Sequence, residues 1–525
     1  MKPLKINYQL MKIFNNYKRN IGVALTLTVL ISINSGCRDF LDTQRQGTYT
    51  ADDYPYPQGG TPYDTFLFSA YDALRAYNYV SDGFMVVTSI RSDDADKGST
   101  PTDGGADVIG MDNFPALTNG RVNSLWSEYF TMIGRCNTII DKVHNSTEII
   151  ATDQMKIQAE AEARFLRAYS YFVLVRAFGR VPKIDKIQDV SSNVSQSTPA
   201  EIYAFIEADL QFAAANLPIA WDKKFVGRST KGAANGILAK VYLYQQKWAM
   251  AMSTANLVMN SGQYDLSTPY NTIFGEAGEN SKESVFEIQG TASATVPTAN
   301  GIQYASIQGT RGNTSEWNRG WGWNTPSAQL EAAYEPGDPR KARTILYSST
   351  ATTPSVTIYG QAAPFYPTEV PNTKYNQKVL VNPAYIAMYN SRSGWWMNVR
   401  ILRYADVVLM YAEAANEVGG ATNTTNALTA LNSVRARARG GNSAVLPDVT
   451  TTDQSALRDA IRHERRVELG MEHERFFDIV RWGIDAEAMQ AAGKTGYNPT
   501  RDKLLPIPQQ QIDLSKGVLT QNPGY

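Results

Sequence analysis

NGILAKVYLYQQKWAMAMSTANLVM (residues 235–259) is the stretch that decides the fold class. Its two parts, 236–244 and 248–259, carry apolar side chains at helical spacing, and the polar QQK lies between them. The positions that set the pattern are Asn235, Leu238, Ala239, Tyr242 and Ala251. Small side chains at such offsets let two antiparallel helices approach closely. The stretch therefore predicts a helical hairpin.

The same pattern returns elsewhere and is that of the tetratricopeptide repeat. A second hairpin is predicted from Tyr411, Ala414, Ala415 and Val418, followed by Ala427, Leu431 and Val434, with a longer loop than usual between its helices. Helical periodicity also marks 126–143, 157–178 and 455–482. We expect a mainly α fold of about four degenerate helix pairs, enough to stack a continuous core.

One long segment shows little of this periodicity. Residues 262–398 are rich in Gly, Thr, Ser, Asn and Pro, which predicts loops with short strands. Together with residues 43–123, this loop-rich lobe is where a binding surface is expected, because binding residues concentrate on loops held by a rigid scaffold.

The composition bounds the function. The chain has 525 residues, of which 43% are hydrophobic, so it can bury a large core. Lys plus Arg equals Asp plus Glu at 50 each, which leaves no net charge to attract nucleic acid. Nucleic-acid binding is therefore not expected.

The N-terminus has the features of a sorting signal. Basic residues precede the apolar run IGVALTLTVLISI (residues 21–33), which is too short to span a bilayer but suits a signal peptide. Residues 34–37, Asn-Ser-Gly-Cys, resemble a lipobox, so we expect a signal peptide over 1–36, lipidation of Cys37 and a membrane anchor. An ordinary secretory signal is the alternative, and Met11 is a second possible start. If Cys37 is acylated, only Cys136 remains and no internal disulfide forms.

Catalysis is not expected. Glu464 and Glu468 lie one helical turn apart, a spacing compatible with a glycosidase carboxylate pair, but Arg465, Arg466 and Arg475 are near enough in register to keep both ionised. Asp406 and Glu413 are expected to make interhelical ion pairs with arginines such as Arg400 or Arg403. The chain has three histidines and no zinc-protease spacing, and it carries no GxSxG elbow or Walker loop.

RSDDADKG (residues 91–98) offers Asp93, Asp94 and Asp96 as calcium ligands, although their spacing departs from an EF-hand loop. Turn and helix-cap roles are the alternative. No other cofactor is expected.

The leading binding candidate is SEWNRGWGWN (residues 315–324), where three tryptophans fall within seven residues. This spacing favours a loop with protruding indoles. The apolar C–H face of a pyranose packs on such a ring, while neighbouring polar side chains bond its hydroxyls. We assign the role to Trp317, Asn318, Arg319 and Trp321, and expect Trp323 to be structural. The alternative is that the rings pack beneath the loop.

Longer motifs resemble one family throughout the chain. The chief ones are IRHERRVELGMEHERFFDIVRWG (residues 461–483) and LLPIPQQQIDLSKGVLTQNPGY (residues 504–525), together with CRDFLD, RSDDADKG, EARFLRAYSYFVLVRAFGRVP, GRSTKGAANGILAKVYLY and ILRYADVVLMYAEAANE. In this order and spacing they resemble the SusD/RagB family of outer-membrane nutrient-binding lipoproteins.

The resemblance implies a tetratricopeptide-like scaffold with a loop-rich lobe, an anchor on the external face of the outer membrane, and a SusC-like TonB-dependent transporter as partner. It implies N-terminal and C-terminal regions over 37–260 and 261–525. It also implies oligosaccharide capture and delivery, with Tyr77, Tyr79, Asn113 and Phe114 as further contacts. Peptide capture of the RagB kind, or a surface glycoside hydrolase, are the alternatives.

Overall fold

The computed structural model describes residues 60–525, apart from 115–119, 190–191, 297–299 and 315. The chain divides into two compact units at residues 57 and 58, and the description below concerns the second unit. The predicted signal peptide and Cys37 lie outside the described residues.

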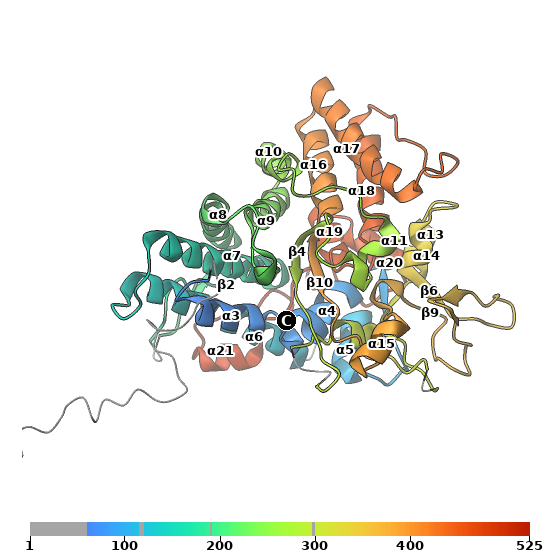
Figure 1. Cartoon of the computed structure of the whole chain (residues 1–525), viewed down its shortest axis with the longest axis horizontal. Coiled ribbons are helices and arrows are strands. Elements are labelled where there is room, and N and C mark those ends of the chain that lie inside the picture. The colour runs from blue at the N-terminus through green and yellow to red at the C-terminus, as the bar shows by residue number, and fades with distance from the viewer. Residues whose placement is uncertain (1–59, 115–119, 190–191, 297–299, 315) are drawn as a thin grey trace, which may run out of the picture. The chain divides into compact units, whose positions relative to one another are not determined.

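A succession of helices forms the scaffold, each packed on the one before it (Figure 1). They are α6 (Gly120–Asn145), α7 (Asp153–Phe178), α8 (Pro199–Asn216), α9 (Lys231–Tyr244), α10 (Trp248–Met259), α16 (Tyr404–Val418), α17 (Ala421–Arg439) and α18 (Gln454–Glu468). Helix α10 packs on α16 although residues 260–403 separate them in sequence. The mainly α class and the stacked helix pairs are confirmed.

The first predicted hairpin is α9 with α10. Thr230 caps α9 by accepting a hydrogen bond from the Ala233 N–H. Gly236 lies where an added Cβ would stand 2.5 Å from Leu402, so a small residue is needed for the helix to approach strand β10 (Val399–Arg403).

The second hairpin, α16 with α17, is also confirmed, but the prediction of a long loop is wrong. Gly419 and Gly420 alone join the two helices, with φ of 74° and 87°. Glycine adopts these left-handed conformations without steric cost, so the chain reverses within two residues.

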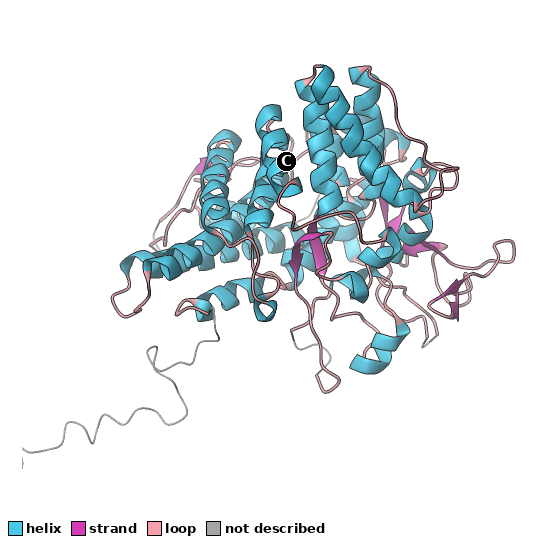
Figure 2. Ribbon diagram, turned by 45° about the horizontal axis from the view of Figure 1, so that its top comes forward, coloured by secondary structure: helices cyan, strands magenta, loops and turns pink. Residues whose placement is uncertain are grey.

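Short strands and loops make the second lobe, as expected (Figure 2). Every sheet among the described residues is a two-stranded antiparallel pair. The strands are β1 (Ala95–Gly98) with β5 (Trp323–Pro326), β4 (Ser284–Ile288) with β10, β6 (Ile345–Tyr347) with β9 (Lys374–Asn376), β7 (Thr357–Ile358) with β8 (Gln361–Ala362), and β2 (Val181–Pro182) with β3 (Gln196–Ser197). The β1–β5 pair joins the two segments in which a binding surface was predicted.

Short helices accompany these strands. In the N-terminal part they are α3 (Asp64–Ala73), the π-helices η1 (Tyr77–Ser81) and η2 (Val86–Ile90), α4 (Asp82–Met85) and α5 (Gly105–Asn113). In the middle of the chain they are η3 (Lys223–Phe225), α11 (Tyr270–Ile273), η4 (Glu276–Gly278), α12 (Tyr304–Gln308), α13 (Ala328–Ala333), α14 (Arg340–Thr344), η5 (Gln377–Val379) and α15 (Pro383–Tyr389). The C-terminal ones are α19 (Arg475–Trp482), α20 (Asp485–Ala491) and α21 (Gln509–Leu514).

The C-terminal residues return to the end of α7. The Leu505 N–H donates to the Ala177 carbonyl at 2.7 Å, and the Asn522 side chain donates to the Phe178 carbonyl at 2.9 Å. The last carbonyls of a helix have no partner within it, so this segment supplies partners for two of them. Cys136 on α6 is fully buried, and burial raises the pKa of its thiol to about 12.

Buried ion pairs connect the scaffold to the lobe. Glu468 at the end of α18 is fully buried and lies 3.1 Å from Arg340, 3.0 Å from Arg403 and 2.6 Å from Arg437. Burial alone would raise the pKa of Glu468, but the surrounding arginines more than offset this and lower it to about 2. An ionised carboxylate of this kind cannot serve as a general acid near neutral pH.

The ionisation expected of Glu468 is supported, but the partners predicted for the two glutamates are wrong. Glu464 binds Arg340 at 2.5 Å and Arg435 at 2.9 Å. Arg465 instead binds Asp406 and Asp478, while Arg466 and Arg475 bind Asp93. The reason is helical geometry: successive residues point about 100° apart, so Arg465 and Arg466 leave the face that Glu464 and Glu468 share.

Asp406 and Glu413 form ion pairs with arginines of other helices, as expected, but the partners are not Arg400 or Arg403. Besides Arg465, Asp406 binds Lys240 at 2.7 Å, and Glu413 binds Arg481 at 2.6 Å. Arg403 forms ion pairs with Glu283, Glu468 and Glu472. It is therefore not available to the acidic residues of α16.

The calcium hypothesis is not supported, because arginines already balance the charge of two of the three proposed aspartate ligands. Asp93 lies 2.9 Å from Arg466 and 2.8 Å from Arg475, and Asp94 lies 2.6 Å from Arg466. Both carboxylates are neutralised by arginines, while Asp96 is exposed on β1. Within the described ranges, no cluster of three or more His, Cys, Asp or Glu side chains is arranged to hold a metal ion.

We expect Glu468→Gln to lower the free energy of unfolding by about 3–5 kcal/mol, because it leaves buried arginines without their counter-charge. Because the folded-state pKa of Glu468 is depressed from 4.5 to about 2, its contribution is present above pH 4.5 and is lost as the pH falls toward 2. Urea unfolding of parent and variant across this range measures it.

The matched control is Glu487→Gln on the exposed surface of α20, where we expect a change within about 0.5 kcal/mol. Equal stability of the Glu468 and Glu487 variants at neutral pH would contradict the role assigned to the network.

Candidate functional site

The tryptophan loop folds back on itself, and this decides which indole is exposed. The Arg319 and Gly320 N–H groups both donate to the Thr310 carbonyl at 2.9 Å, and the Thr310 hydroxyl donates to the Trp317 carbonyl at 2.7 Å. Trp317 is thereby drawn inward, and only 2% of its surface is exposed. The expectation that Trp317 protrudes is wrong.

Trp317 packs in a small apolar cluster with Leu346, Val370, Tyr375 and Leu380. Its ring is covered by the guanidinium of Arg319, 4.3 Å from the ring centroid. Arg319 is itself buried and donates to the Glu316 and Val381 carbonyls and to Gln361. The guanidinium of Arg319 is therefore used in hydrogen bonds within the protein and does not face a ligand. Asn318, in contrast, is exposed.

Trp321 is the exposed indole, with 42% of its surface open to solvent. The main-chain N–H of Trp321 donates to the Ser306 carbonyl at 2.9 Å, and the main-chain N–H of Gly322 donates to the Gly309 carbonyl at 2.8 Å. The indole ring of Trp321 meets Trp323 edge-on, with 5.4 Å between centroids. Trp323 is buried beneath it, as predicted, and lies 5.2 Å from the guanidinium of Arg121.

Tyr77 also contacts Trp321, with 6.3 Å between the ring centroids and 61° between the ring planes. Tyr77 opens π-helix η1, which contacts α12. Burial and the charge of Asp82 raise the pKa of Tyr77 above its usual value, so its hydroxyl stays neutral. Two candidates chosen from separate parts of the sequence thus form one aromatic surface.

Polar side chains lie on the segments next to the two rings. Arg75, two residues before Tyr77, donates to the Asn300 carbonyl at 2.8 Å and to its side chain at 3.3 Å. Arg311 pairs with Asp103 and donates to the Ser99 hydroxyl, and the Ser99 N–H donates to the Gly322 carbonyl. We call Trp321, Tyr77 and these polar residues the Trp321 surface.

Tyr79 and Phe114 do not contribute to it. Tyr79 is 1% exposed, stacks on Tyr129 at 4.2 Å and bonds Ser170, so it belongs to the core. It follows Tyr77 by two residues, which in a helix places it on a different face. Phe114 is also 1% exposed and packs on Tyr497. Asn113 is exposed at the end of α5.

Four residues of this region were not predicted from the sequence: Arg75, Asn300, Arg121 and Arg311. Arg75 lies beside the tyrosines in RAYNYVSDG, so proximity to Tyr77 was a usable signal. No sequence signal pointed to Asn300 or Arg311, because only the folding of the lobe brings their segments close to the segments that carry the rings.

Comparisons with known proteins agree across the chain. A family model described as "SusD family" matches residues 282–525, and one described as "Starch-binding associating with outer membrane" matches residues 76–243. A SusD-like protein of Formosa agariphila is 30% identical over 483 residues, which cover 87% of this chain and 91% of that one.

Solved structures give the same result. A laminarin-binding SusD-like protein is 26% identical with a TM-score of 0.72, covering 90% of this chain and 100% of its own. Surface glycan-binding protein A from Bacteroides fluxus is 26% identical with a TM-score of 0.73, and the coverage is again 90% and 100%. The chain therefore belongs to the SusD family.

Proposed function

We propose that this protein captures an oligosaccharide at the Trp321 surface, on the outer face of the outer membrane, and delivers it to a SusC-like TonB-dependent transporter. The observation that carries the proposal is the pairing of Trp321, 42% exposed, with Tyr77. An exposed large aromatic ring flanked by polar groups is the arrangement expected where a ligand has both an apolar face and hydroxyl groups.

Binding follows from the geometry of this surface. A pyranose ring stacks its apolar C–H face on the Trp321 indole, and its hydroxyls exchange hydrogen bonds with Arg75, Asn300 and Arg311. The backbone around Trp321 is fixed by hydrogen bonds to Ser306 and Gly309. A preformed surface loses less conformational entropy on binding than a mobile loop does. No chemical step is involved.

Anchoring is proposed from the N-terminal sequence. The lipobox-like residues before Cys37 support acylation, and the family description of association with the outer membrane supports the location. No helix in the described part of the chain has both the length and the hydrophobicity to cross a membrane.

We expect Trp321→Ala to weaken oligosaccharide binding at least tenfold, about 1.4 kcal/mol, because the stacking surface is lost. The measurement is isothermal titration calorimetry, starting with laminarin oligosaccharides because a solved relative binds laminarin. A peptide series run in parallel tests the alternative ligand class.

Phe68→Ala is the matched control, since Phe68 is 46% exposed on α3 and belongs to no described aromatic pair. Trp317→Ala serves as a stability control: we expect it to cost about 3–5 kcal/mol of unfolding free energy because Trp317 is buried. Oligosaccharide binding that persists in Trp321→Ala would overturn the site, and binding of peptides alone would overturn the ligand class.

We expect Cys37→Ala to release the protein from the membrane, because the acyl chains supply the anchor. Fractionation of cells into membrane and soluble proteins, with metabolic labelling by a fatty acid, measures this. Cys136→Ala is the control, because Cys136 is fully buried in α6. A Cys37→Ala protein that stays in the membrane fraction and keeps its label would contradict the anchor.

A further inference from the structure

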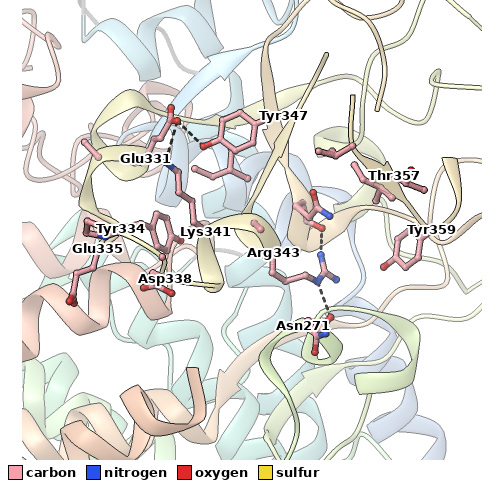
Figure 3. Close-up of a pocket in the computed structure, with 18 residues that line it drawn as sticks. Asn271, Glu331, Tyr334, Glu335, Asp338, Lys341, Arg343, Tyr347, Thr357 and Tyr359 are labelled. Carbon is pink, nitrogen blue, oxygen red and sulfur yellow. Dashed lines mark hydrogen bonds and ion pairs between the residues drawn. The ribbon is translucent and has the colours of Figure 1, made fainter. Parts of the chain in front are cut away.

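A groove of about 920 Å³ opens in the loop-rich lobe (Figure 3). It is lined by α13, α14, β6, the β7–β8 hairpin and Asn271 of α11. Its volume lies near the upper end of the roughly 300–1,000 Å³ range of small-molecule sites. None of its lining residues belongs to the Trp321 surface.

The acidic side chains of the groove already have internal partners. Asp338 lies 2.8 Å from Arg340, and Glu335 lies 2.7 Å from Arg435. Glu331 accepts a hydrogen bond from the Tyr347 hydroxyl at 2.7 Å and pairs with Lys374 at 3.1 Å. These carboxylates are therefore neutralised and leave no unpaired negative charge in the groove.

Arg343 of α14 is different. It is 8% exposed, and its Nε donates to the Asn271 carbonyl at 3.0 Å while Nη1 donates to the Gln377 carbonyl. Its Nη2 is buried without any hydrogen-bond acceptor, and no carboxylate of the described residues lies within ion-pair distance. Burial lowers the pKa of Arg343, as expected for a charge removed from water.

Figure 3 shows the guanidinium of Arg343 between Asn271 and the hairpin residues Thr357 and Tyr359. An unpaired buried charge is costly to a fold, and arginine's planar fork matches a carboxylate or a sulfate. Arg340, Arg403 and Arg437 have acidic partners within the chain. Arg319 has none, but each of its guanidinium nitrogens donates to an acceptor, whereas Nη2 of Arg343 has no acceptor. The missing partner of Arg343 is therefore one that a ligand would supply.

The groove walls suit a ring-shaped ligand. Tyr359 at the tip of the β7–β8 hairpin is 44% exposed, and Val356 beside it is 52% exposed. Apolar and aromatic walls around one charged group are typical of sites that fix the orientation of a small organic anion.

We infer that this groove is a second subsite, which takes the carboxylate or sulfate group of an acidic saccharide, with Arg343 as its counter-ion and Tyr359 against the sugar ring. The saccharide part of this inference rests on the proposed function. The anion part rests on Arg343 alone.

The test is calorimetry on the full chain in a detergent that contains no sugar. The probes are a uronic-acid oligosaccharide, a sulfated oligosaccharide, a neutral oligosaccharide and inorganic sulfate. We expect Arg343→Gln to weaken at least one acidic oligosaccharide tenfold or more and to leave neutral binding unchanged. Trp321→Ala should weaken the neutral probe far more than the acidic one. The uronic and sulfated probes distinguish the two anionic groups.

Arg392→Gln is the charge-matched control, because Arg392 is exposed and outside the groove. Tyr359→Ala is the second variant, since it alters an exposed side chain and does not depend on Arg343→Gln folding; we expect it to weaken acidic binding several-fold. Thermal unfolding checks that the Arg343→Gln and Tyr359→Ala variants are folded.

The inference is overturned if the parent binds no acidic oligosaccharide, or if acidic binding is equal in the parent, Arg343→Gln and Tyr359→Ala. Binding of inorganic sulfate alone overturns the saccharide assignment. If every variant, including Trp321→Ala, still binds the neutral oligosaccharide as the parent does, the proposed function is overturned instead. The two failures are therefore distinguishable.

Discussion

The buried ion-pair network around Glu468 is the constraint on which the rest of the structure depends. Its arginines come from α14 in the lobe, β10 at the junction and α17 in the scaffold, so one carboxylate holds three elements that are distant in sequence. Charges buried in this way are tolerated only when each has partners, which fixes the elements relative to one another. The Trp321 surface and the Arg343 groove both lie in the lobe that this network secures.

Local sequence patterns predicted the scaffold well, because its helices carry their own periodicity. The offsets of Leu238, Ala239 and Tyr242 were enough to indicate the α9–α10 hairpin. Such local patterns could not indicate which acidic residue pairs with which arginine, because Glu468 and Arg340 are brought together only by tertiary packing. The two-glycine turn at Gly419 and Gly420 was missed because helix ends are weakly marked in a pattern of apolar residues.

The candidate site shows the same limit at finer scale. Counting tryptophans found the loop that carries an exposed indole, but composition cannot distinguish Trp317, which is turned inward by the hydrogen bonds of Thr310, from Trp321, which is exposed. Tyr77 and Trp321 were both chosen, yet their contact depends on α12 meeting η1. Arg343 carried no signal at all, since an arginine in a loop-rich segment is expected to be solvated.

The Trp321 surface is held mainly through the main chain, by the hydrogen bonds that join Trp321, Gly322 and Ser99 to their neighbours. Main-chain bonds of this kind are indifferent to the side chains they carry. Mutations that replace a ring or a polar group on this surface can therefore accumulate without loss of the backbone beneath it. Such an arrangement lets the side chains of the surface change while the fold beneath them is kept.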